Sequence, residues 1–517
     1  MQKENIRNLI QLLDDSAFLF PRKVALIFGT KKVTYSELAD FSKKLALSLS
    51  KLGVGEFDKV ALWLPNFPEF VYSFFAVLRL RAIVVPINSM FKREEARFIV
   101  EDCCAKVLIC SIDKVEDSEN ILLRSNCLKQ IICFPAPEGK QIVLDFNKLL
   151  EDSEFKEIIN INENDFAEIV YTSGTTGHPK GACLSHKNLV SNIKDCAQII
   201  RFSRKDRLLC ILPLFHSFSS TVCMLLPLYK GATIVIMRSV RPFKRVIRAI
   251  SKHRITVFVG VPSVFSILNE IKISPLRLLF NIFVNPIRLC ISGAAALPLS
   301  VWQNFEKKFR RRLLQGYGLT EASPVVSLNP TRDRRKPDSI GVVLPSVKVK
   351  VVDKNDNELA PDKIGELLVK GPNVMQGYYN LEEETRKVLK NGWLYTGDLA
   401  RIDAEGFIYI MGRIKEMINV RGFNVYPCEI EDLLYKYPKV KEAAVVGVPH
   451  KHRGEVPVAF VAAECLVDER QILNYLRTNL ASYKVPLKIL LRDSLPKNST
   501  GKILKRQLQE EIKEIFA

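Results

Sequence analysis

The sequence has no Cys-x-x-Cys pair, although it contains twelve cysteines. Most of them stand singly in apolar runs, as Cys110, Cys210, Cys223 and Cys290 do. This distribution argues against a disulfide framework and against a zinc site, and it predicts the reduced thiols of a cytoplasmic protein. The N-terminal residues contain no apolar signal core, so we expect no secretion.

Formal charge is absent from Leu208 to Tyr229, a run long enough to span a bilayer. Pro213, His216 and Pro227 interrupt this run, however. A membrane-spanning helix therefore fits poorly, and we expect a buried strand, a loop and a helix instead.

Negative charge is scarce, because 56 acidic residues stand against 76 lysines and arginines, a formal net charge of +20. Such an excess draws anions such as nucleotides, coenzyme A, phospholipid headgroups or nucleic acid. A general preference for lysine on solvated faces explains the charge equally well. The charge alone therefore assigns no partner.

The length of 517 residues exceeds the size at which one hydrophobic core keeps growing, so we expect at least two domains. In the first part of the chain, helical and strand patterns alternate, beginning with the capping box Thr34-Tyr-Ser-Glu37. The predicted strands there are 60–64, 82–86, 106–110, 233–237 and 255–259. This alternation predicts an α/β fold of mainly parallel sheets flanked by helices.

The pattern changes after about residue 340, where strand-like segments crowd together with glycine and Asn/Asp turns. They predict a small β-rich subdomain at 347–352, 365–369 and 407–411. From Gly412 onward, three strands and a helix predict a compact α+β unit. We therefore predict an N-terminal domain at 1–411 and a small mobile C-terminal domain at 412–517, with a hinge near Lys415.

The most informative segment is Tyr171-Thr-Ser-Gly-Thr-Thr-Gly-His-Pro-Lys-Gly-Ala182, which follows a short apolar run. Glycines let several backbone N–H groups point at one anion, and hydroxyls and a lysine add further donors. This chemistry suits the phosphates of a nucleotide, although the string is not a Walker loop. Taken alone, such a loop is more often a flexible surface turn.

The segment resembles the signature loop of adenylate-forming enzymes, a family of acyl-CoA synthetases, luciferases and peptide-synthetase adenylation domains. Further motifs of that family follow in order, and the resemblance extends from residue 34 to residue 505. They are Leu212-Pro-Leu-Phe-His-Ser-Phe218, Ile291-Ser-Gly-Ala-Ala-Ala296, Gln315-Gly-Tyr-Gly-Leu-Thr-Glu321, Tyr395-Thr-Gly-Asp398, Gly412-Arg-Ile-Lys-Glu416, Asn419-Val-Arg-Gly-Phe-Asn-Val-Tyr-Pro-Cys-Glu-Ile-Glu431 and Leu495-Pro-Lys-Asn-Ser-Thr-Gly-Lys502.

The resemblance implies ATP, Mg²⁺ and coenzyme A as reactants or cofactors, and it implies a role for particular residues. Those implied to bind nucleotide or coenzyme are Thr172, Ser173, Gly174, Thr175, Thr176, Gly177, Lys180, Gly293, Ala294, Ala295, Gly316, Tyr317, Gly318, Asp398, Arg413 and Gly422. Those implied to be catalytic are His216, Thr320, Glu321 and Lys502, and the implied metal ligands are Thr172 and Glu321.

Within these motifs, the resemblance implies that Tyr317 stacks on adenine and that Asp398 binds the ribose. It implies that Lys502 bridges the substrate carboxylate and the α-phosphate. It further implies that the small domain turns about Lys415 and presents Gly422 to the pantetheine arm. The pair Gly293-Ala294 departs from relatives that have two glycines there, which leaves a backbone contact with adenine in place.

Without the resemblance, several of these residues have simpler interpretations. A lone histidine in an apolar run, such as His216, is more often a core residue. A single aspartate such as Asp398 is usually a cap or turn residue.

The substrate is predicted from what is missing, because no acidic residue between Leu208 and Met237 could pair with an ammonium group. We expect a fatty acyl-CoA ligase for medium or long chains. The alternatives are an acyl-acyl carrier protein ligase, activation of another apolar carboxylate, and a basic membrane- or nucleic-acid-binding protein that keeps only the fold. For the ligase we expect no nucleic-acid partner.

One further segment, Pro275 to Leu289, places Arg277 and Arg288 among leucines and phenylalanines. It suits either a helix packed on the core, which we favour, or a contact with a membrane surface. The predicted location is accordingly the cytoplasm, with peripheral contact at the inner face of the membrane as an addition.

Overall fold

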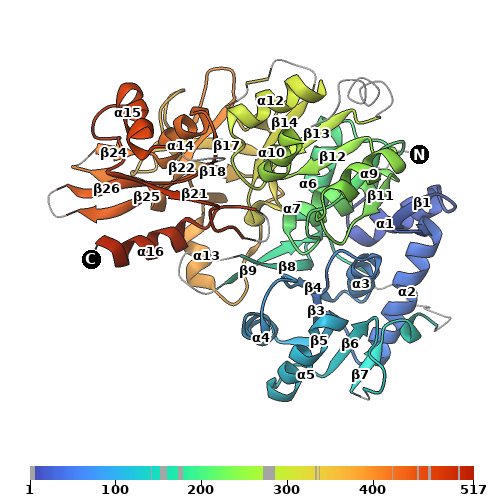
Figure 1. Cartoon of the computed structure of the whole chain (residues 1–517). Coiled ribbons are helices and arrows are strands. Elements are labelled where there is room, and N and C mark those ends of the chain that lie inside the picture. Colours follow the sequence, from blue (N-terminus) through green and yellow to red (C-terminus); the bar gives the residue numbers. More distant parts are fainter. Residues whose placement is uncertain are drawn as a thin grey trace.

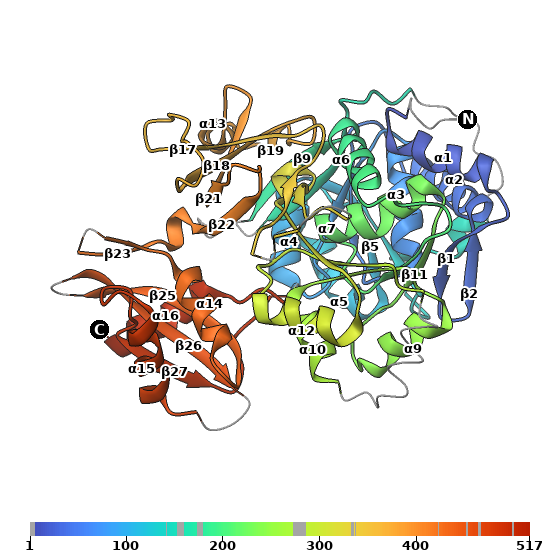
Figure 2. The ribbon, with the colours of Figure 1, turned by 90° about the horizontal axis from the view of Figure 1, so that it is seen from above.

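The computed structural model describes residues 6–140, 142–151, 160–172, 179–271, 286–331, 335–336, 338–421, 423–450, 453–463, 467–498 and 501–516. Figures 1 and 2 show a large N-terminal part built on two sheets, a small sheet, and a C-terminal unit in red and orange at one end of the molecule. Elements α1, α9 and β1 lie at the opposite end.

The first large sheet has the order β16-β15-β14-β13-β12-β10-β11-β1-β2, and its strands from β14 to β1 are parallel. Strands such as β11 and β12 are buried along their whole length, as expected where helices cover a parallel sheet. The strands are β1 (Val24–Phe28), β2 (Lys31–Thr34), β10 (Arg207–Cys210), β11 (Thr233–Ile236), β12 (Val257–Gly260), β13 (Leu289–Ser292), β14 (Leu313–Gly318), β15 (Val325–Leu328) and β16 (Val342–Val343).

The second large sheet has the order β19-β9-β8-β4-β3-β5-β6-β7, with parallel pairing from β8 to β7. Its strands are β3 (Lys59–Trp63), β4 (Ile83–Pro86), β5 (Ala105–Ser111), β6 (Gln130–Phe134), β7 (Val143–Asp145), β8 (Phe166–Thr172), β9 (Lys180–Ser185) and β19 (Gly377–Tyr378). The antiparallel pair β8 and β9 lies on either side of the predicted phosphate loop.

Helices connect and cover these strands. The helix that begins after Thr34 has the predicted capping box, because the N–H of Glu37 donates to Thr34 Oγ1 at 3.2 Å and the N–H of Thr34 donates to Glu37 Oε2 at 2.7 Å. The helices of this part are α1 (Leu9–Leu19), α2 (Tyr35–Lys51), α3 (Pro68–Arg79), α4 (Arg93–Asp102), α5 (Val115–Arg124), α6 (His186–Ile199), α7 (Ser217–Ser219), α8 (Leu226–Lys230), α9 (Lys244–Lys252), α10 (Pro262–Glu270), α12 (Leu299–Phe309) and α13 (Glu382–Val388). Short helical turns are η2 (Ile112–Lys114), η3 (Lys148–Leu150), η4 (Ser220–Leu225) and η5 (Thr320–Ala322).

The predicted β-rich subdomain is an antiparallel sheet of the order β17-β18-β21-β20, with β22 paired to β21. Its strands are β17 (Lys348–Val352), β18 (Gly365–Lys370), β20 (Leu389–Lys390), β21 (Trp393–Ile402) and β22 (Ile408–Arg413). The predicted hinge residue Lys415 lies in η6 (Ile414–Glu416), directly after β22.

The C-terminal unit has apolar cores of its own, formed by residues from 418 onward. Its elements are β23 (Ile418–Val420), β24 (Phe423–Val425), α14 (Pro427–Lys436), β25 (Val440–His450), β26 (Gly454–Ala463), α15 (Glu469–Asn479), β27 (Lys488–Arg492) and α16 (Lys505–Phe516). The predicted fold class is thus confirmed, whereas the domain boundary and the hinge stay predictions.

The uncharged run Leu208 to Tyr229 forms β10, a loop, α7, η4 and most of α8, and nearly all of it is buried. This agrees with the predicted strand, loop and helix. Among the described residues, no helix is both long and apolar enough to cross a bilayer.

One prediction differs from the structure. Cys104 and Cys127 form a disulfide with their Cα atoms 5.2 Å apart, so the prediction of reduced thiols is wrong for this pair. The two residues meet because each precedes one of the paired strands β5 and β6. Residues 272–285, which include Arg277, lie outside the described residues, so the role of the segment Pro275 to Leu289 stays a prediction. Arg288 is exposed and donates to the buried Asp206 at 2.8 and 2.9 Å.

Candidate active site

The predicted ribose ligand Asp398 is buried and lies at the centre of a small polar group. The hydroxyl of Tyr317 donates to Asp398 Oδ2 at 2.5 Å, and Arg413 Nε lies 3.0 Å from Asp398 Oδ1. Strands position all three, since Tyr317 is in β14 and Asp398 pairs with Arg413 across β21 and β22. Burial and the Asp398 carboxylate raise the pKa of Tyr317, which keeps the hydroxyl protonated as a donor.

Lys502 lies on the C-terminal side of this group. A tight turn holds it, because the N–H of Lys502 donates to Asn498 Oδ1 at 2.9 Å and the N–H of Asn498 donates to the Lys502 carbonyl at 2.9 Å. Lys502 as a whole residue is exposed, yet the pKa of its ammonium is lowered, mainly because surrounding protein displaces water from it and also because Arg413 repels it. Glu416 and Asp398 oppose this shift, which places Lys502 in the field of the Asp398 group.

The neighbouring lysines differ from Lys502 in their partners. Lys497 pairs with Glu442, and Lys505 lies 3.2 Å from Glu416 and 2.7 Å from Glu431. Within the part of the chain that the structure describes, no carboxylate lies within 4.0 Å of the Lys502 ammonium. Lys502 is therefore the lysine of this segment whose charge is available to a bound anion.

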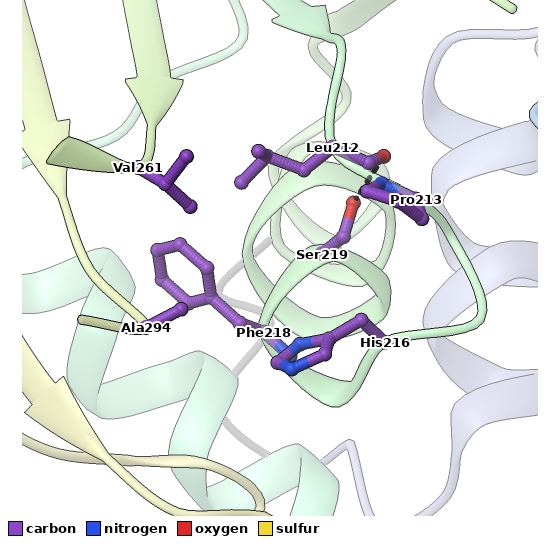
Figure 3. A pocket seen from close by; sticks show the side chains of 7 residues that line it. All are labelled: Leu212, Pro213, His216, Phe218, Ser219, Val261 and Ala294. Atoms are coloured by element: carbon purple, nitrogen blue, oxygen red, sulfur yellow. Dashed lines mark hydrogen bonds between the residues drawn. The ribbon is translucent and has the colours of Figure 1, made fainter. Parts of the chain in front are cut away.

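A cavity of about 10 Å³ lies where the predicted acyl and nucleotide sites meet, and Figure 3 shows the side chains around it. Its walls carry no charged side chain and consist of Leu212, Pro213, His216, Phe218, Ser219, Val261 and Ala294. The loop of Lys502 contacts this wall, because a Cβ built on Gly501 would lie 2.8 Å from Ser263 Oγ and 3.6 Å from Val261 Cγ2. One lysine loop thus adjoins both the cavity and the Asp398 group.

His216 is largely buried, and this burial lowers its pKa to about 4. Its Nδ1 accepts a hydrogen bond from the N–H of Phe218 at 3.2 Å. The neutral ring therefore carries its proton on Nε2, and that N–H is a donor rather than a general base.

The Phe218 ring forms part of the cavity wall. It lies against the backbone after β13, since a Cβ built on Gly293 would meet Phe218 Cζ at 2.8 Å. In Figure 3 the ring points toward Val261, with Ala294 beside it. Ala294 has a φ of 67° in the left-handed region, where glycine is unstrained, so the predicted departure from two glycines costs backbone strain here.

Thr320 and Glu321 lie in η5, which brings the remaining predicted catalytic residues to the same edge of the sheet. The hydroxyls of Thr320 and Ser217 are 3.1 Å apart, so Thr320 adjoins the His216 loop. Tyr378 donates its hydroxyl to Glu321 Oε1 at 2.8 Å.

Lys180 is the described cation of the predicted phosphate loop. It forms an ion pair with Glu384 of α13 and lies 5.4 Å above the Tyr378 ring. Thr172, at the end of β8, donates its hydroxyl to the Lys180 carbonyl at 3.4 Å. The predicted ligands Ser173, Gly174, Thr175, Thr176, Gly177 and Gly422 lie outside the described residues.

Three predicted nucleotide contacts involve mainly backbone. A Cβ on Gly318 would lie 2.1 Å from the Pro324 carbonyl oxygen, and one on Gly316 would lie 3.1 Å from Leu328 Cδ1. The neighbouring strand β15 therefore already requires glycine at position 318. Ala295 follows Ala294 in the turn after β13, beside the cavity wall.

The residues at the predicted metal site fit Mg²⁺ in chemical type. Glu321 offers a carboxylate and Thr172 a hydroxyl, and Mg²⁺ takes oxygen ligands from one or two protein groups, substrate phosphates and water. Tyr378 links Glu321 to Thr172 through Lys180. Its hydroxyl donates to Glu321, and its ring lies 5.4 Å from the Lys180 ammonium. The Lys180 carbonyl in turn accepts the hydroxyl of Thr172.

Comparison with known proteins matches this architecture to one family. The model of the AMP-binding enzyme matches residues 13–379, and that of the AMP-binding enzyme C-terminal domain matches residues 429–502. The chain belongs to the AMP-binding enzyme family. Its predicted resemblance to adenylate-forming enzymes and its predicted class, an acid–thiol ligase, are confirmed.

Relatives within the AMP-binding enzyme family match over nearly the whole chain. The long-chain-fatty-acid–CoA ligase of Bacillus subtilis is 35% identical over 98% of this chain and 95% of that protein. The 4-coumarate–CoA ligase 1 of Petroselinum crispum is 35% identical over 95% of this chain and 91% of that protein.

Among solved structures, ATP-bound MatB from Rhodopseudomonas palustris aligns with a TM-score of 0.91 at 31% identity, over 99% of this chain and 100% of MatB. Apo MatB aligns over the same shares with a TM-score of 0.80. The arrangement of this chain is thus more similar to the ATP-bound form of MatB than to its apo form.

Four residues of the site were not predicted from the sequence: Ser217, Phe218, Tyr378 and Glu384. The first two belong to the His216 motif, whose apolar character drew attention to the histidine alone. Tyr378 and Glu384 meet partners that are 57 and 204 residues away, and nothing local signals such contacts.

Proposed function

We propose that this AMP-binding enzyme activates an apolar carboxylic acid with ATP and transfers the acyl group to the thiol of coenzyme A. The position of Lys502 carries the proposal. Its ammonium has no carboxylate partner among the described residues, its loop contacts the cavity wall at Val261, and it lies in the field of Asp398 and Arg413. At this position, the single ammonium of Lys502 can offset negative charge on both the substrate carboxylate and the α-phosphate.

In the first half-reaction, a carboxylate oxygen attacks the α-phosphorus of ATP, and the bond to the β-phosphate oxygen breaks. Acyl-AMP and pyrophosphate result. Lys502 and Arg413 offset the negative charge of the reacting groups, and the Nε2–H of His216 donates to the carboxylate as it is positioned beside the cavity. Asp398 and Tyr317 hold the ribose and the adenine.

Lys180, with Thr172 and the loop between them, holds the phosphates that leave as pyrophosphate. Glu321 and Thr172 would hold Mg²⁺, and the ion would offset negative charge on the phosphate oxygens. Thr320 lies between this region and the His216 loop, where it donates to the α-phosphate.

In the second half-reaction, we propose that the C-terminal unit, residues 412–517, turns about Lys415. The turn withdraws Lys502 and brings Gly422 to the acyl-AMP. The thiol then releases its proton, and the sulfur attacks the acyl carbonyl carbon to form the thioester. The bond between that carbon and the phosphate oxygen breaks, and AMP leaves with its electron pair. Closure in each state shields an intermediate that water would hydrolyse. The higher TM-score against ATP-bound MatB supports assigning the present arrangement to the first half-reaction.

The uncharged cavity wall favours an apolar acid, for which we propose a medium- or long-chain fatty acid. The 35% identity to a long-chain-fatty-acid–CoA ligase supports this choice. Pockets that enclose organic ligands are about 300–1,000 Å³, so a cavity of about 10 Å³ requires Phe218 to move before a chain enters. The similarity to a 4-coumarate–CoA ligase favours an aromatic acid as the second candidate.

Thioester formation with a panel of acids tests the proposal. The panel contains fatty acids from short to long, 4-coumarate and benzoate, and each is offered with coenzyme A and with acyl carrier protein as acceptor. We expect ATP-dependent thioester with coenzyme A and the highest kcat/KM for fatty acids. A higher kcat/KM for the aromatic acids supports the second candidate. If acyl carrier protein is acylated faster than coenzyme A, it replaces coenzyme A as the proposed acceptor. Absence of pyrophosphate release with every acid contradicts the proposal.

A further inference from the structure

Helix α1 ends in an exposed apolar tip. The helix buries Leu9, Leu12 and Leu13 against the core, but Phe18 is 80% exposed and Leu19 is 36% exposed. A folded chain gains stability by burying a Phe side chain, so a Phe that is left in water at the end of a helix is a candidate for contact with a partner.

Cations surround this tip. Arg22 follows it directly and is exposed, as are Arg204 and Lys205 in the loop before β10. The Arg204 guanidinium lies 5.7 Å from the Phe20 ring. Lys23 donates to the carbonyls of Arg204 and Gly231, which ties the end of α1 to the loops before β10 and β11.

The positive charge continues along the same edge to the loop before β12. Arg207 donates to the His253 carbonyl at 2.9 Å, and His253 is flanked by the exposed residues Lys252 and Arg254. Burial lowers the pKa of His253, and the charges of Lys252, Arg207 and Lys32 lower it further, which is consistent with one continuous basic area.

Acidic residues do little to neutralise this area. The sequence has none between Asp206 and Glu270, and Asp206 itself is buried and accepts from Arg288. In α1, Asp14 pairs with Arg79, which leaves Asp15 as the exposed carboxylate closest in sequence to the tip.

The area lies away from the active site. Arg204 and Arg254 precede the N-terminal ends of β10 and β12, whereas the cavity residues Leu212 and Val261 follow the C-terminal ends of the same strands. Figures 1 and 2 both place α1, β1 and α9 at the end of the molecule remote from the C-terminal unit. A partner bound here leaves the proposed rotation of that unit free.

We propose that this surface, the basic edge, docks on an anionic lipid bilayer. It consists of Phe18, Leu19, Arg22, Arg204, Lys205, Lys252 and Arg254. An apolar tip that enters the headgroup region, with cations around it that attract acidic headgroups, is the chemistry of a peripheral membrane contact. An acidic carrier protein fits less well, because its pantetheine must reach the active-site cavity, which lies at the opposite ends of β10 and β12. The inference is independent of the proposed substrate.

Co-sedimentation of the full chain with vesicles tests the proposal. Vesicles of phosphatidylcholine alone are compared with vesicles that also contain phosphatidylglycerol, at about 0.1 M and about 1 M salt, where the screening lengths are about 10 Å and about 3 Å. We expect binding to the anionic vesicles at low salt. Each cation near such a surface contributes about fivefold in partitioning, so Arg204→Glu with Lys205→Glu lowers binding at least tenfold. Phe18→Ser with Leu19→Ser also lowers binding.

Matched controls distinguish an effect of the basic edge from the effect of changing any exposed apolar or charged side chain. Leu123→Ser removes a side chain that is 81% exposed on α5, and Lys354→Glu with Lys363→Glu reverses two exposed charges of the β-rich subdomain. Both controls are expected to bind like the wild type, and pyrophosphate release in vesicle-free buffer reports that every variant is folded.

Three results with vesicles overturn the proposal: no binding of the wild type to anionic vesicles, equal binding by the variants of the basic edge and the wild type, or equal loss in the control variants. Duplex DNA is the remaining comparison. The proposal is overturned in favour of nucleic acid if the chain binds DNA at least as tightly as vesicles and if charge reversal abolishes this binding while the Phe18 variant keeps it.

Discussion

Asp398 and Arg413 face each other across paired strands, with Arg413 Nε 3.0 Å from Asp398 Oδ1. The other carboxylate oxygen accepts the hydroxyl of Tyr317. Both oxygens are thus oriented by groups from different strands, and this arrangement supports the proposed role of Asp398 in nucleotide binding over that of a turn residue.

Asp398→Asn removes the charge but keeps the shape of this group. Hydrogen bonds to a charged partner contribute about 1.5–3 kcal/mol, so we expect the KM for ATP in carboxylate-dependent pyrophosphate exchange to rise roughly 10- to 150-fold. The exposed Asp362→Asn, whose carboxylate pairs with Arg401 on the same sheet, serves as the control. An unchanged KM for the Asp398 variant contradicts its assignment to the ribose.

Lys502→Ala separates the two half-reactions. We expect adenylate formation to fall by orders of magnitude, because the ammonium offsets charge in that step. Thioester formation from supplied acyl-AMP is expected to stay within a few-fold of the wild type. Lys497→Ala is the matched control, since that lysine pairs with Glu442. Equal loss in both half-reactions argues against the assigned division between Lys502 and the Gly422 loop.

Glu384 holds Lys180 in the structure, and this pair competes with phosphate for the ammonium. In Glu384→Gln, ATP binding no longer has to break this ion pair. The KM for ATP is therefore expected to fall about two- to fivefold, which corresponds to the free energy of a partly exposed ion pair. Glu383→Gln changes a neighbouring carboxylate of α13 and is expected to have no effect. A rise in KM indicates instead that Glu384 positions Lys180 for the phosphates.

Phe218 limits the cavity, because its ring lies against Gly293. Phe218→Ala is expected to raise kcat/KM for long-chain acids relative to short or aromatic acids by tenfold or more. Val261→Ala, which shortens another wall residue, serves for comparison. If the chain-length profile of the Phe218 variant matches that of the wild type, the acyl chain does not pass this ring.

Glu168 in β8 is fully buried, neither of its carboxylate oxygens has a hydrogen-bond partner among the described residues, and burial raises its pKa to about 8. The folded state thus holds a proton that the unfolded chain releases near pH 4.5. Stability therefore falls as pH rises from about 4.5 to about 8 and is flat above that range. In Glu168→Met this contribution is absent, so we expect its melting temperature to exceed that of the wild type increasingly toward pH 8. A constant difference contradicts the assignment.

Local patterns predicted most of the fold. The Thr34–Glu37 capping box and the apolar run at 233–237 act through neighbours in sequence, and the structure places α2 and β11 there. Long-range pairs could not be predicted in this way. Arg288 reaches Asp206 across 82 residues, and Cys104 meets Cys127 only because β5 and β6 are neighbours in the sheet.

The candidate site shows the same division. Asp398, Arg413 and Lys502 were identified because each lies in a motif that resembles the family. Tyr378 was missed because its position depends on β19 pairing with β9, a register that no local pattern indicates. The size of the cavity depends on the rotamer of Phe218, which only the packed structure specifies.

Transfer of ¹⁸O from the carboxylate to AMP tests the central claim most directly. A fatty acid labelled with ¹⁸O in its carboxyl group is converted with ATP and coenzyme A, and the AMP is analysed by mass spectrometry. Attack of the carboxylate on the α-phosphorus predicts one ¹⁸O atom in each AMP formed. Label in inorganic phosphate, or AMP without label, contradicts an acyl-adenylate route.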